Sequence, residues 1–240
     1  MKDYEVYSSL KVPKNSKIVI RLDGRSFHKL ASDLKLIKPY DENFYNVISK
    51  VCRDLFEEFS PLFVYTFSDE ISLILDNVPF EGRVEKIDSV VASFTASSFV
   101  MHYDVDFTKP PAFDSRIIPI AEGDILKYFR WRQDECWRNC VNSHGITYLK
   151  SKYSNAEAND KINGLKLNEI HELLFQIGIN LNDVETYKKR GIGIYRKHKE
   201  VVGFNKKENR NQTSYRSYVH TDWELPKFTE EFFKKIGVIK

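Results

Sequence analysis

Acidic residues follow two short apolar segments of this sequence, and their chemistry depends on whether the fold brings them together. Asp23 stands in RLDGRSF directly after the apolar run KIVI, and Asp69 and Glu70 stand in YTFSDEISLIL. Clustered carboxylates raise each other's pKa unless a cation is present. Oxygen ligands without His or Cys at matching spacing favour Mg²⁺ over Zn²⁺. Two such ions stabilise the attacking and leaving oxygens of a phosphoryl transfer, which is the chemistry that these acids indicate.

Gly24 follows the first acid and allows the backbone to approach a ligand closely, so its carbonyl oxygen is a further candidate metal ligand. Taken singly, DG is also typical of a turn and SDE of a hairpin tip. The metal-site interpretation therefore depends on the two acidic motifs lying at adjoining strand ends.

A phosphate site also needs cations, and basic residues surround the acidic motifs. Strand alternation places Arg21 on the same side of its strand as Asp23. Arg83 and Lys86 lie on one face at the start of a predicted helix, whose N-terminus favours phosphate. Surface solubility is the alternative explanation for each cation, and a loop position is the alternative for His28. The full set of candidates is Arg21, Arg25, His28, Lys38, Arg83 and Lys86.

The elements that position these residues follow from hydrophobic periodicity and turn signals. The pattern predicts strands over 17–22, 62–67, 71–76 and 115–121, and helices over 41–59, with Asp41 as N-cap, and 84–103. This βαββαβ order is the ferredoxin-like arrangement of an α+β protein. Its first and third strands are antiparallel neighbours, so Asp23 is expected beside Asp69 and Glu70.

The rest of the chain is predicted to extend this core. We expect helices over 122–142 and near 166–176, a basic β-rich segment from about 186 to 222, and an amphipathic closing helix within 222–237. The predicted division is a palm-like catalytic core over 1–135 and a C-terminal helical and β-rich extension over 136–240, packed on the core.

Composition favours an ordinary globular protein inside the cell. Of 240 residues, 42% are hydrophobic and 30% charged, and the net charge is +3. No apolar run reaches the roughly 18 residues of a membrane span, and the N-terminus lacks the pattern of a signal peptide. Three cysteines, an odd number, indicate reduced thiols. We therefore expect a cytoplasmic protein that does not contact a membrane.

Basic residues concentrate between Thr186 and Arg216, where ten Lys or Arg stand against two acids, with aromatic residues between them. Such a segment suits a nucleic-acid backbone, and a solvated lysine-rich hairpin is the alternative. The candidate RNA contacts are Arg132, Arg138, Lys188, Lys189, Arg190 and Arg196. Cys136 and Cys140 lack two further ligands at zinc spacing, and core packing is favoured for Trp131 and Trp137.

Six motifs occur together in one order and carry a family resemblance. They are RLDGRSFHKL (21–30), KPYD (38–41), SDEISL (68–73), VASFTASSF (91–99), PPAFDSR (110–116) and WRQDECWRN (131–139). The sequence from about 17 to 200 resembles the tRNA-histidine guanylyltransferases and their archaeal and bacterial Thg1-like relatives.

The resemblance implies a polymerase palm that adds nucleotides to the 5′ end of tRNA in the 3′–5′ direction. The 5′ end is activated, and the 3′-hydroxyl of the next nucleotide then attacks it. The resemblance implies two or more Mg²⁺ ions for this reaction and ATP and GTP as its substrates. It also implies that the protein is typically a homotetramer. The implied metal ligands are Asp23, the Gly24 carbonyl and Asp69, with Glu70 as a further catalytic acid. The implied nucleotide contacts are Arg21, Gly24, Arg25, Ser26, Phe27, His28, Lys38, Asp41, Ser68, Arg83 and Lys86.

One departure from the family pattern separates the predicted substrates. Eukaryotic members carry a HINNLYN-like stretch where this chain has WRNCVNS (137–143), so Trp137 replaces His and Cys140 replaces the second Asn. This favours the Thg1-like branch and template-directed repair of 5′-truncated tRNA. The alternatives are non-templated addition of the extra G to tRNA-His, and a ferredoxin-like RNA-binding module without catalysis.

Overall fold

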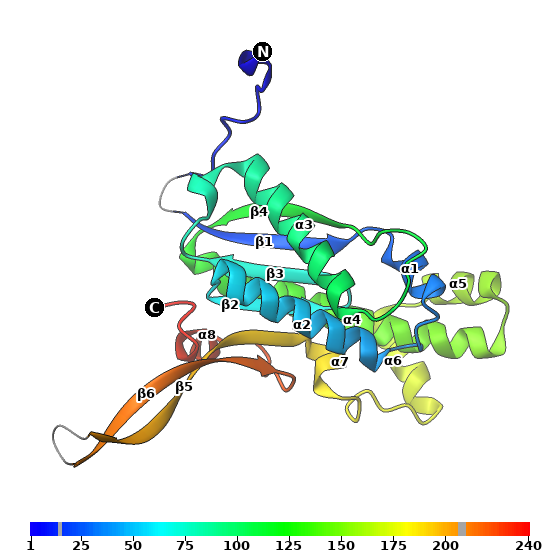
Figure 1. The fold of residues 1–240 in the computed structure, drawn as a ribbon. Coiled ribbons are helices and arrows are strands. Elements are labelled where there is room, and N and C mark those ends of the chain that lie inside the picture. The colour runs from blue at the N-terminus through cyan, green and yellow to red at the C-terminus, as the bar shows by residue number, and fades with distance from the viewer. Residues whose placement is uncertain (14–15, 206–209) are drawn as a thin grey trace.

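One antiparallel sheet forms the centre of the molecule in a computed structural model that describes residues 1–13, 16–205 and 210–240 (Figure 1). Within these residues the strand order is β4-β1-β3-β2-β5-β6. The strands are β1 (Lys17–Gly24), β2 (Phe63–Phe67), β3 (Glu70–Leu75), β4 (Phe113–Ile120), β5 (Ile192–Asn205) and β6 (Arg210–Asp222). The first four strands with their helices form the predicted ferredoxin-like core, and the α+β class is confirmed.

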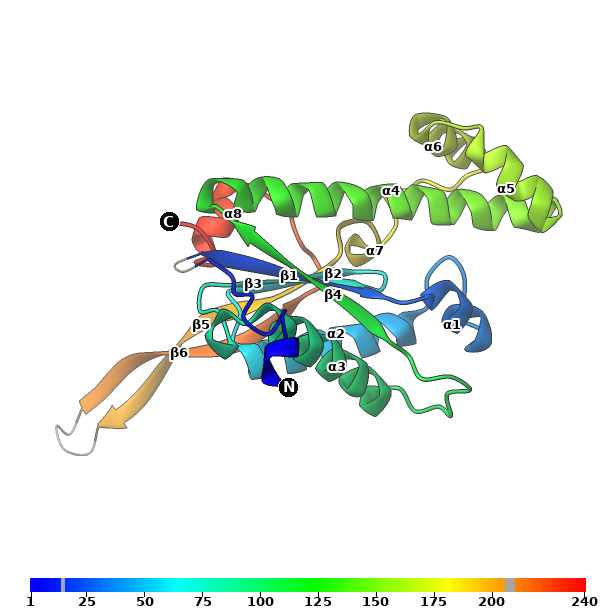
Figure 2. The ribbon, with the colours of Figure 1, turned by 90° about the horizontal axis from the view of Figure 1, so that it is seen from above.

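Helices cover both faces of this sheet (Figure 2). On one face lie α2 (Glu42–Phe59) and α3 (Val84–His102), and α4 (Ile125–Lys152) crosses the other face together with α8 (Glu230–Lys235). The remaining helical elements are α1 (Phe27–Asp33), α5 (Asn155–Asn163), α6 (Leu167–Gln176), α7 (Thr186–Arg190) and the 3-10 turns Lys2–Tyr4, Phe80–Gly82 and Glu122–Asp124. Within the described residues, no helix combines the length and the apolar character that crossing a bilayer requires.

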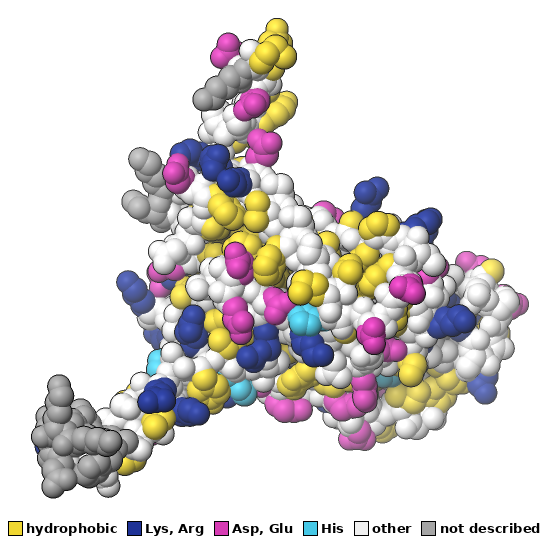
Figure 3. Space-filling view, viewed as in Figure 1, with side chains coloured by type: hydrophobic (Ala, Val, Ile, Leu, Met, Phe, Trp, Pro, Cys, Tyr) yellow, Lys and Arg dark blue, Asp and Glu magenta, His cyan; other side chains and the backbone are white. Residues whose placement is uncertain are grey.

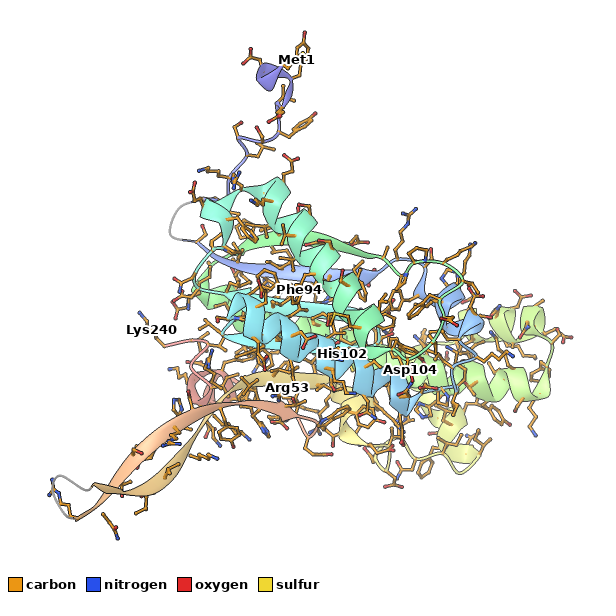
Figure 4. All side chains as sticks on the ribbon, viewed as in Figure 1. Met1, Arg53, Phe94, His102, Asp104 and Lys240 are labelled. Atoms are coloured by element: carbon orange, nitrogen blue, oxygen red, sulfur yellow. The ribbon has the colours of Figure 1, made fainter. Side chains whose placement is uncertain are left out.

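The α2–α3 layer is fixed by an apolar interface and by a few polar contacts. The α2 helix buries an apolar stripe against the sheet, as its periodicity predicts. Asp54 Oδ2 accepts a hydrogen bond from Ser98 Oγ at 2.6 Å and lies 2.7 Å from His102 Nε2. Arg53, labelled with His102 in Figure 4, donates to the Val219 carbonyl oxygen of β6 at 3.4 Å. These contacts therefore link α2 to α3 and to β6.

The α4 helix is longer than predicted. The expected end near residue 142 is wrong because the helix continues through Gly145 to Lys152. A Cβ at Gly145 would lie only 2.6 Å from the Ile170 side chain of α6, so the glycine serves close helix packing rather than helix termination. The helix also runs through the predicted 135/136 division, and β5 pairs with β2, so the core and the extension share one sheet.

Two shorter elements also differ from the prediction. The sequence pattern predicts no helix where α5 lies, yet this helix begins at a capping box formed by Ser154 and Glu157. The closing helix expected over 222–237 is only the short α8. Pro226 and an extended segment precede it, and the Thr229 side chain accepts from the Phe232 N–H to cap its first turn.

The predicted basic β-rich segment is a long two-stranded arm. The β5 strand pairs with β2 only through Ile192–Ile194, while β5 and β6 pair with each other along their length and project from the body (Figures 1 and 2). The described part of the arm carries Arg196, Lys197, Lys199 and Arg216. Lys206, Lys207 and Glu208 of the basic segment lie outside the described residues.

Candidate active site

The sheet register brings the acidic motifs together, as the topology predicts. Asp23 lies directly opposite Glu70 of β3 on one side and Asp114 of β4 on the other. Asp69 stands in the two-residue turn between β2 and β3, where Ser68 has a φ of 51°. A non-glycine residue in this left-handed region is uncommon and marks a constrained turn. The turn therefore fixes Asp69 beside the end of β1.

Burial and a neighbouring carboxylate raise the pKa of both aspartates. For Asp69, burial raises the pKa most, the Ser68 hydroxyl donates to Oδ1 at 2.9 Å and opposes this, and the charge of Asp23 raises it further. For Asp23, burial again comes first, and Asp114 adds to the increase while Arg116 and Arg21 oppose it. A site that disfavours its own carboxylate charges is one that a cation stabilises.

The donor set fits Mg²⁺ as a partial ligand shell. In the described part of the chain, no three His, Cys, Asp or Glu side chains gather so that they could hold a metal by themselves. Mg²⁺ is commonly bound through one or two carboxylates and completes its shell with water and substrate phosphates. The oxygen-only pair of Asp23 and Asp69 satisfies that requirement, and the Gly24 carbonyl belongs to the same strand end.

Gly24 has a structural reason besides the predicted one. A Cβ at this position would lie 2.4 Å from the ring of Phe27, so the packing of that ring requires a glycine here. Phe27 is 6% exposed and packs against Phe44, Phe99 and Phe113. Phe27, predicted as a nucleotide contact, is thus primarily part of the aromatic core beneath the site.

Two cavities meet at the turn that carries Asp69. The first cavity, about 380 Å³, is lined by the predicted residues Gly24, Ser26, Phe27, His28, Lys38, Asp41, Ser68 and Asp69, together with Lys188. The second cavity, also about 380 Å³, is lined by Arg21, Asp23, Glu70, Arg116, Trp131 and Arg132. Ser68, Asp69 and Asn139 line both. The acids therefore stand between two cation-bearing spaces.

Glu70 and Arg132 form a buried ion pair on the wall of the second cavity. Arg132 Nη1 donates to Glu70 Oε2 at 2.8 Å, and the Arg132 guanidinium lies 3.4 Å from the Trp131 ring centroid. Glu70 Oε1 and Arg132 Nε are buried and have no hydrogen-bond partner among the residues that the structure describes. Arg132 is 5% exposed, so the structure places this predicted tRNA contact inside the protein, where it holds Glu70 beside Asp23.

Asp41 acts as a helix cap at the edge of the first cavity. Its Oδ1 accepts from the Phe44 N–H at 2.9 Å and its Oδ2 from the Ile37 N–H at 3.0 Å, so both oxygens hold backbone. The predicted N-cap is confirmed, and each carboxylate oxygen already accepts one backbone N–H.

We expect Asp41→Ala to lower the free energy of unfolding by about 1 kcal/mol, the usual effect of removing an N-cap. Urea denaturation measures this loss, and Asp41→Asn, which keeps an accepting oxygen, is the matched control. A loss of nucleotide binding with unchanged stability in Asp41→Ala would instead indicate a direct contact to nucleotide.

Several predicted site residues lie away from these cavities. Arg83 and Lys86 stand at the start of α3, at the opposite end of the sheet from Asp23 (Figure 1). Arg25 is exposed, and its backbone N–H donates to the Ala112 carbonyl. Arg138 is exposed and paired with Glu135. Three further predicted RNA contacts also lie elsewhere. Arg196 packs over Phe56, and Lys189 and Arg190 line another cavity.

Sequence reasoning missed several residues that line the catalytic cavities, among them Arg116 of β4. Glu135 and Asn139 follow Trp131 at intervals of four on α4 and face the acids together. That helical spacing within WRQDECWRN was the available signal. Ser143, one further turn along, lines the first cavity.

Comparisons with known proteins agree with this geometry. The family model described as tRNAHis guanylyltransferase matches residues 1–121, and the model of the Thg1 C-terminal domain matches residues 123–227. The tRNA(His) guanylyltransferase of Schizosaccharomyces pombe is 34% identical over 191 residues, which cover 74% of this chain and 72% of that protein.

Solved structures show the same fold over the whole chain. A bacterial tRNA(His) guanylyltransferase (Thg1)-like protein in complex with GTP has a TM-score of 0.73 at 26% identity, covering 99% of this chain and 96% of that chain. Such a protein in complex with ATP has a TM-score of 0.77 at 23% identity, covering 100% and 97%. The chain therefore belongs to the tRNA-His guanylyltransferase (Thg1) family of nucleotidyltransferases.

Proposed function

We propose that this protein is a Mg²⁺-dependent 3′–5′ nucleotidyltransferase that repairs 5′-truncated tRNA by templated addition, after activation of the 5′ end by ATP or GTP. The observation that carries the proposal is the placement of Asp69 between two cation-lined cavities, with Asp23 beside it in the second cavity. A transfer between two phosphate-bearing substrates requires such an arrangement. The GTP and ATP bound by the solved relatives support nucleoside triphosphates as substrates.

Each side of the site has a part in this chemistry. Asp23 and Asp69 would hold Mg²⁺ with the Gly24 carbonyl, and the bound ion stabilises charge on the attacking and leaving oxygens. In the first cavity, Lys38 and Lys188 bind and orient phosphate groups. In the second cavity, the cations Arg21 and Arg116 receive the other phosphate-bearing end, and the Arg21 guanidinium lies 5.6 Å from the Trp131 ring centroid. Glu70, held by Arg132, supports the charge balance at Asp23.

The sheet argues against a non-catalytic RNA-binding module. Such modules stack bases on aromatic residues of an exposed sheet face. Here helices cover both faces of the sheet (Figure 2), and the central strands β1 and β3 are largely buried. The acids at the strand ends would repel RNA without a bound cation.

In the described part of the chain, neither residue that departs from the family pattern lines a catalytic cavity. Cys140 is fully buried, and burial raises the pKa of its thiol. Trp137 points to the side of α4 opposite Asn139 and lines other cavities. The changes therefore leave the acids untouched, and we propose that they alter which RNA is accepted rather than the reaction.

We propose a homotetramer as the assembly. The first residues of the chain project from the body (Figures 1 and 3) and expose Tyr4, Val6, Tyr7 and Leu10. Arg83 and Lys86 lie far from the acids of their own chain. Their predicted role in triphosphate binding would therefore require the site of a second subunit.

An incorporation assay tests the proposed function. We supply Mg²⁺, ATP and 5′-truncated tRNAs that differ in the base opposite the missing nucleotide, and offer each nucleoside triphosphate separately. Templated repair predicts that the added base follows its complement on every tRNA. Addition of G regardless of the opposite base, restricted to tRNA-His, would support the guanylyltransferase alternative. Binding of tRNA without any incorporation would support the non-catalytic module.

A further inference from the structure

A third cavity lies on the side of α4 opposite the catalytic acids. This cavity, which we call the back cavity, has a volume of about 550 Å³. It lies between α4, α7 and the segment 225–229, and its charged and aromatic lining includes Arg130, Asp134, Trp137, Lys189, Arg190 and Lys227. Four cations thus face one carboxylate in a space that the proposed reaction does not use.

The cations of the back cavity are not neutralised by the protein. Arg130 Nε donates to the Phe228 carbonyl at 2.9 Å, Arg190 Nη1 to the Leu225 carbonyl at 3.3 Å, and Lys189 Nζ to the Asn182 carbonyl at 2.6 Å. Lys227 makes no hydrogen bond or ion pair within the part of the chain that the structure describes. Among those residues, none of the four forms an ion pair with a carboxylate. Their positive charge is therefore available to an anion.

Paired cations elsewhere in the molecule make this arrangement distinctive. Arg138 on the same helix is paired with Glu135, and Lys188, the immediate neighbour of Lys189, is paired with Glu185 at 2.8 Å. Lys127, Lys150 and Lys152 of α4 also lack an ion pair among the described residues, but they do not line the back cavity. The back cavity is distinguished by four such cations around one space.

A buried glutamine fixes the three walls of the back cavity relative to one another. Gln133 Nε2 donates to the carbonyls of Arg190 (3.3 Å) and Pro226 (3.0 Å), and its Oε1 accepts from the Phe228 N–H at 2.9 Å. The Tyr65 hydroxyl of β2 also donates to the Arg190 carbonyl at 3.0 Å. Because these bonds hold the cation-bearing backbone in place, a ligand would bind with a smaller ordering cost.

The α7 helix connects the back cavity to the catalytic side. Lys188 lines the first cavity, whereas the next two residues, Lys189 and Arg190, line the back cavity. A polyanion that enters the first cavity can therefore continue over α7, from Lys38 in the first cavity to Lys189 and Arg190 in the back cavity. A free nucleotide would need only one of the two spaces.

We propose that the back cavity binds backbone phosphates of the same tRNA whose 5′ end occupies the catalytic site, with Trp137 as a surface for ribose or base stacking. This inference rests on the proposed function, because it takes tRNA as the substrate. Phosphate contacts position a nucleic acid without reading its sequence, and aromatic side chains add sequence-tolerant stacking. Such a contact suits an enzyme whose template selects the nucleotide.

The test uses the full-length chain and a 3′-fluorescein-labelled tRNA in polarisation titrations at several salt concentrations. We expect Lys227→Glu to raise the Kd for tRNA about three- to tenfold near 0.1 M salt and to reduce the salt slope by about one. Arg130→Gln should act in the same direction. Lys227 is exposed and makes no hydrogen bond or ion pair within the described residues, so its replacement carries little risk to folding. Lys50→Glu, an exposed lysine of α2 on the other face of the sheet, is the matched control.

Two results would overturn the inference. One is a Kd and a salt slope for Lys227→Glu equal to those of the wild type and of Lys50→Glu. The other is a loss of GTP affinity in the absence of tRNA with unchanged tRNA binding, which would assign the back cavity to a free nucleotide. Failure of the proposed function looks different, because the wild-type protein itself would then bind no tRNA or add no nucleotide to it.

Discussion

Asp23→Asn is expected to reduce nucleotide addition by about 10³-fold or more, because charge stabilisation by a bound metal contributes several kcal/mol to such reactions. Binding of tRNA should remain, since Asp23 lies at the strand end between the cavities and not on the basic surfaces. The measurement is single-turnover addition to a 5′-truncated tRNA at saturating Mg²⁺. Asp104→Asn, an exposed acid after α3 that is labelled in Figure 4, is the charge-matched control.

The same substitution is expected to stabilise the metal-free protein. The pKa of Asp23 is raised in the folded state, chiefly by burial and by Asp114. Such a group contributes stability below its unfolded pKa and loses that contribution as the pH rises through the folded value. At pH 7 the ionised carboxylate therefore opposes folding, and the neutral amide does not. We expect the melting temperature in EDTA to rise, by about 2–4 °C for each kcal/mol gained.

Addition of Mg²⁺ separates a metal site from simple acid crowding. A ligand that binds only the folded state raises the melting temperature of the wild type, and this increase should be smaller in Asp23→Asn. Incorporation within tenfold of the wild-type rate, or a lower melting temperature in EDTA, would contradict the assignment of Asp23 as a metal ligand.

The convergence of the acids could be predicted because it follows from topology alone. Antiparallel neighbours place the end of one strand beside the start of the other, so Asp23 had to meet the turn at Asp69 once the βαββαβ order was recognised. The same rule, carried one step further, excludes Arg83 from this end. The β3 strand begins at the acids and runs away from them, so α3 starts at the far end of the sheet.

Tertiary packing decided the features that local patterns could not show. The sequence indicated a ligand approach at Gly24, and no local pattern showed that the ring of Phe27 also occupies the space where a Cβ would be. Arg132 looked like a surface cation on a helix, because arginine is rarely buried without a partner. Its partner, Glu70, lies 62 positions away in the sequence, and no local pattern links the two.

Arg132→Met is expected to lower the free energy of unfolding by about 3–5 kcal/mol, because it leaves the Glu70 carboxylate buried without its cation. Burial raises the pKa of Glu70 in spite of Arg132, so the carboxylate is already in an unfavourable environment. The melting temperature should fall by roughly 6–20 °C, at about 2–4 °C for each kcal/mol. Arg138→Met on the same helix, which breaks an exposed pair with Glu135, should cost at most about 1 kcal/mol.

A double-mutant cycle distinguishes a buried charge pair from simple loss of packing. In Glu70→Gln/Arg132→Met neither charge of this buried pair remains. We therefore expect the double variant to recover most of the stability that Arg132→Met loses. Urea denaturation of the four proteins gives the coupling energy. Additive losses would show that the Arg132 side chain acts through its contact with Trp131 instead. Glu70 pairs in register with Asp23, so the stable double variant should still add nucleotides far more slowly than the wild type. This result would separate the structural role of the pair from its electrostatic role at the catalytic acids.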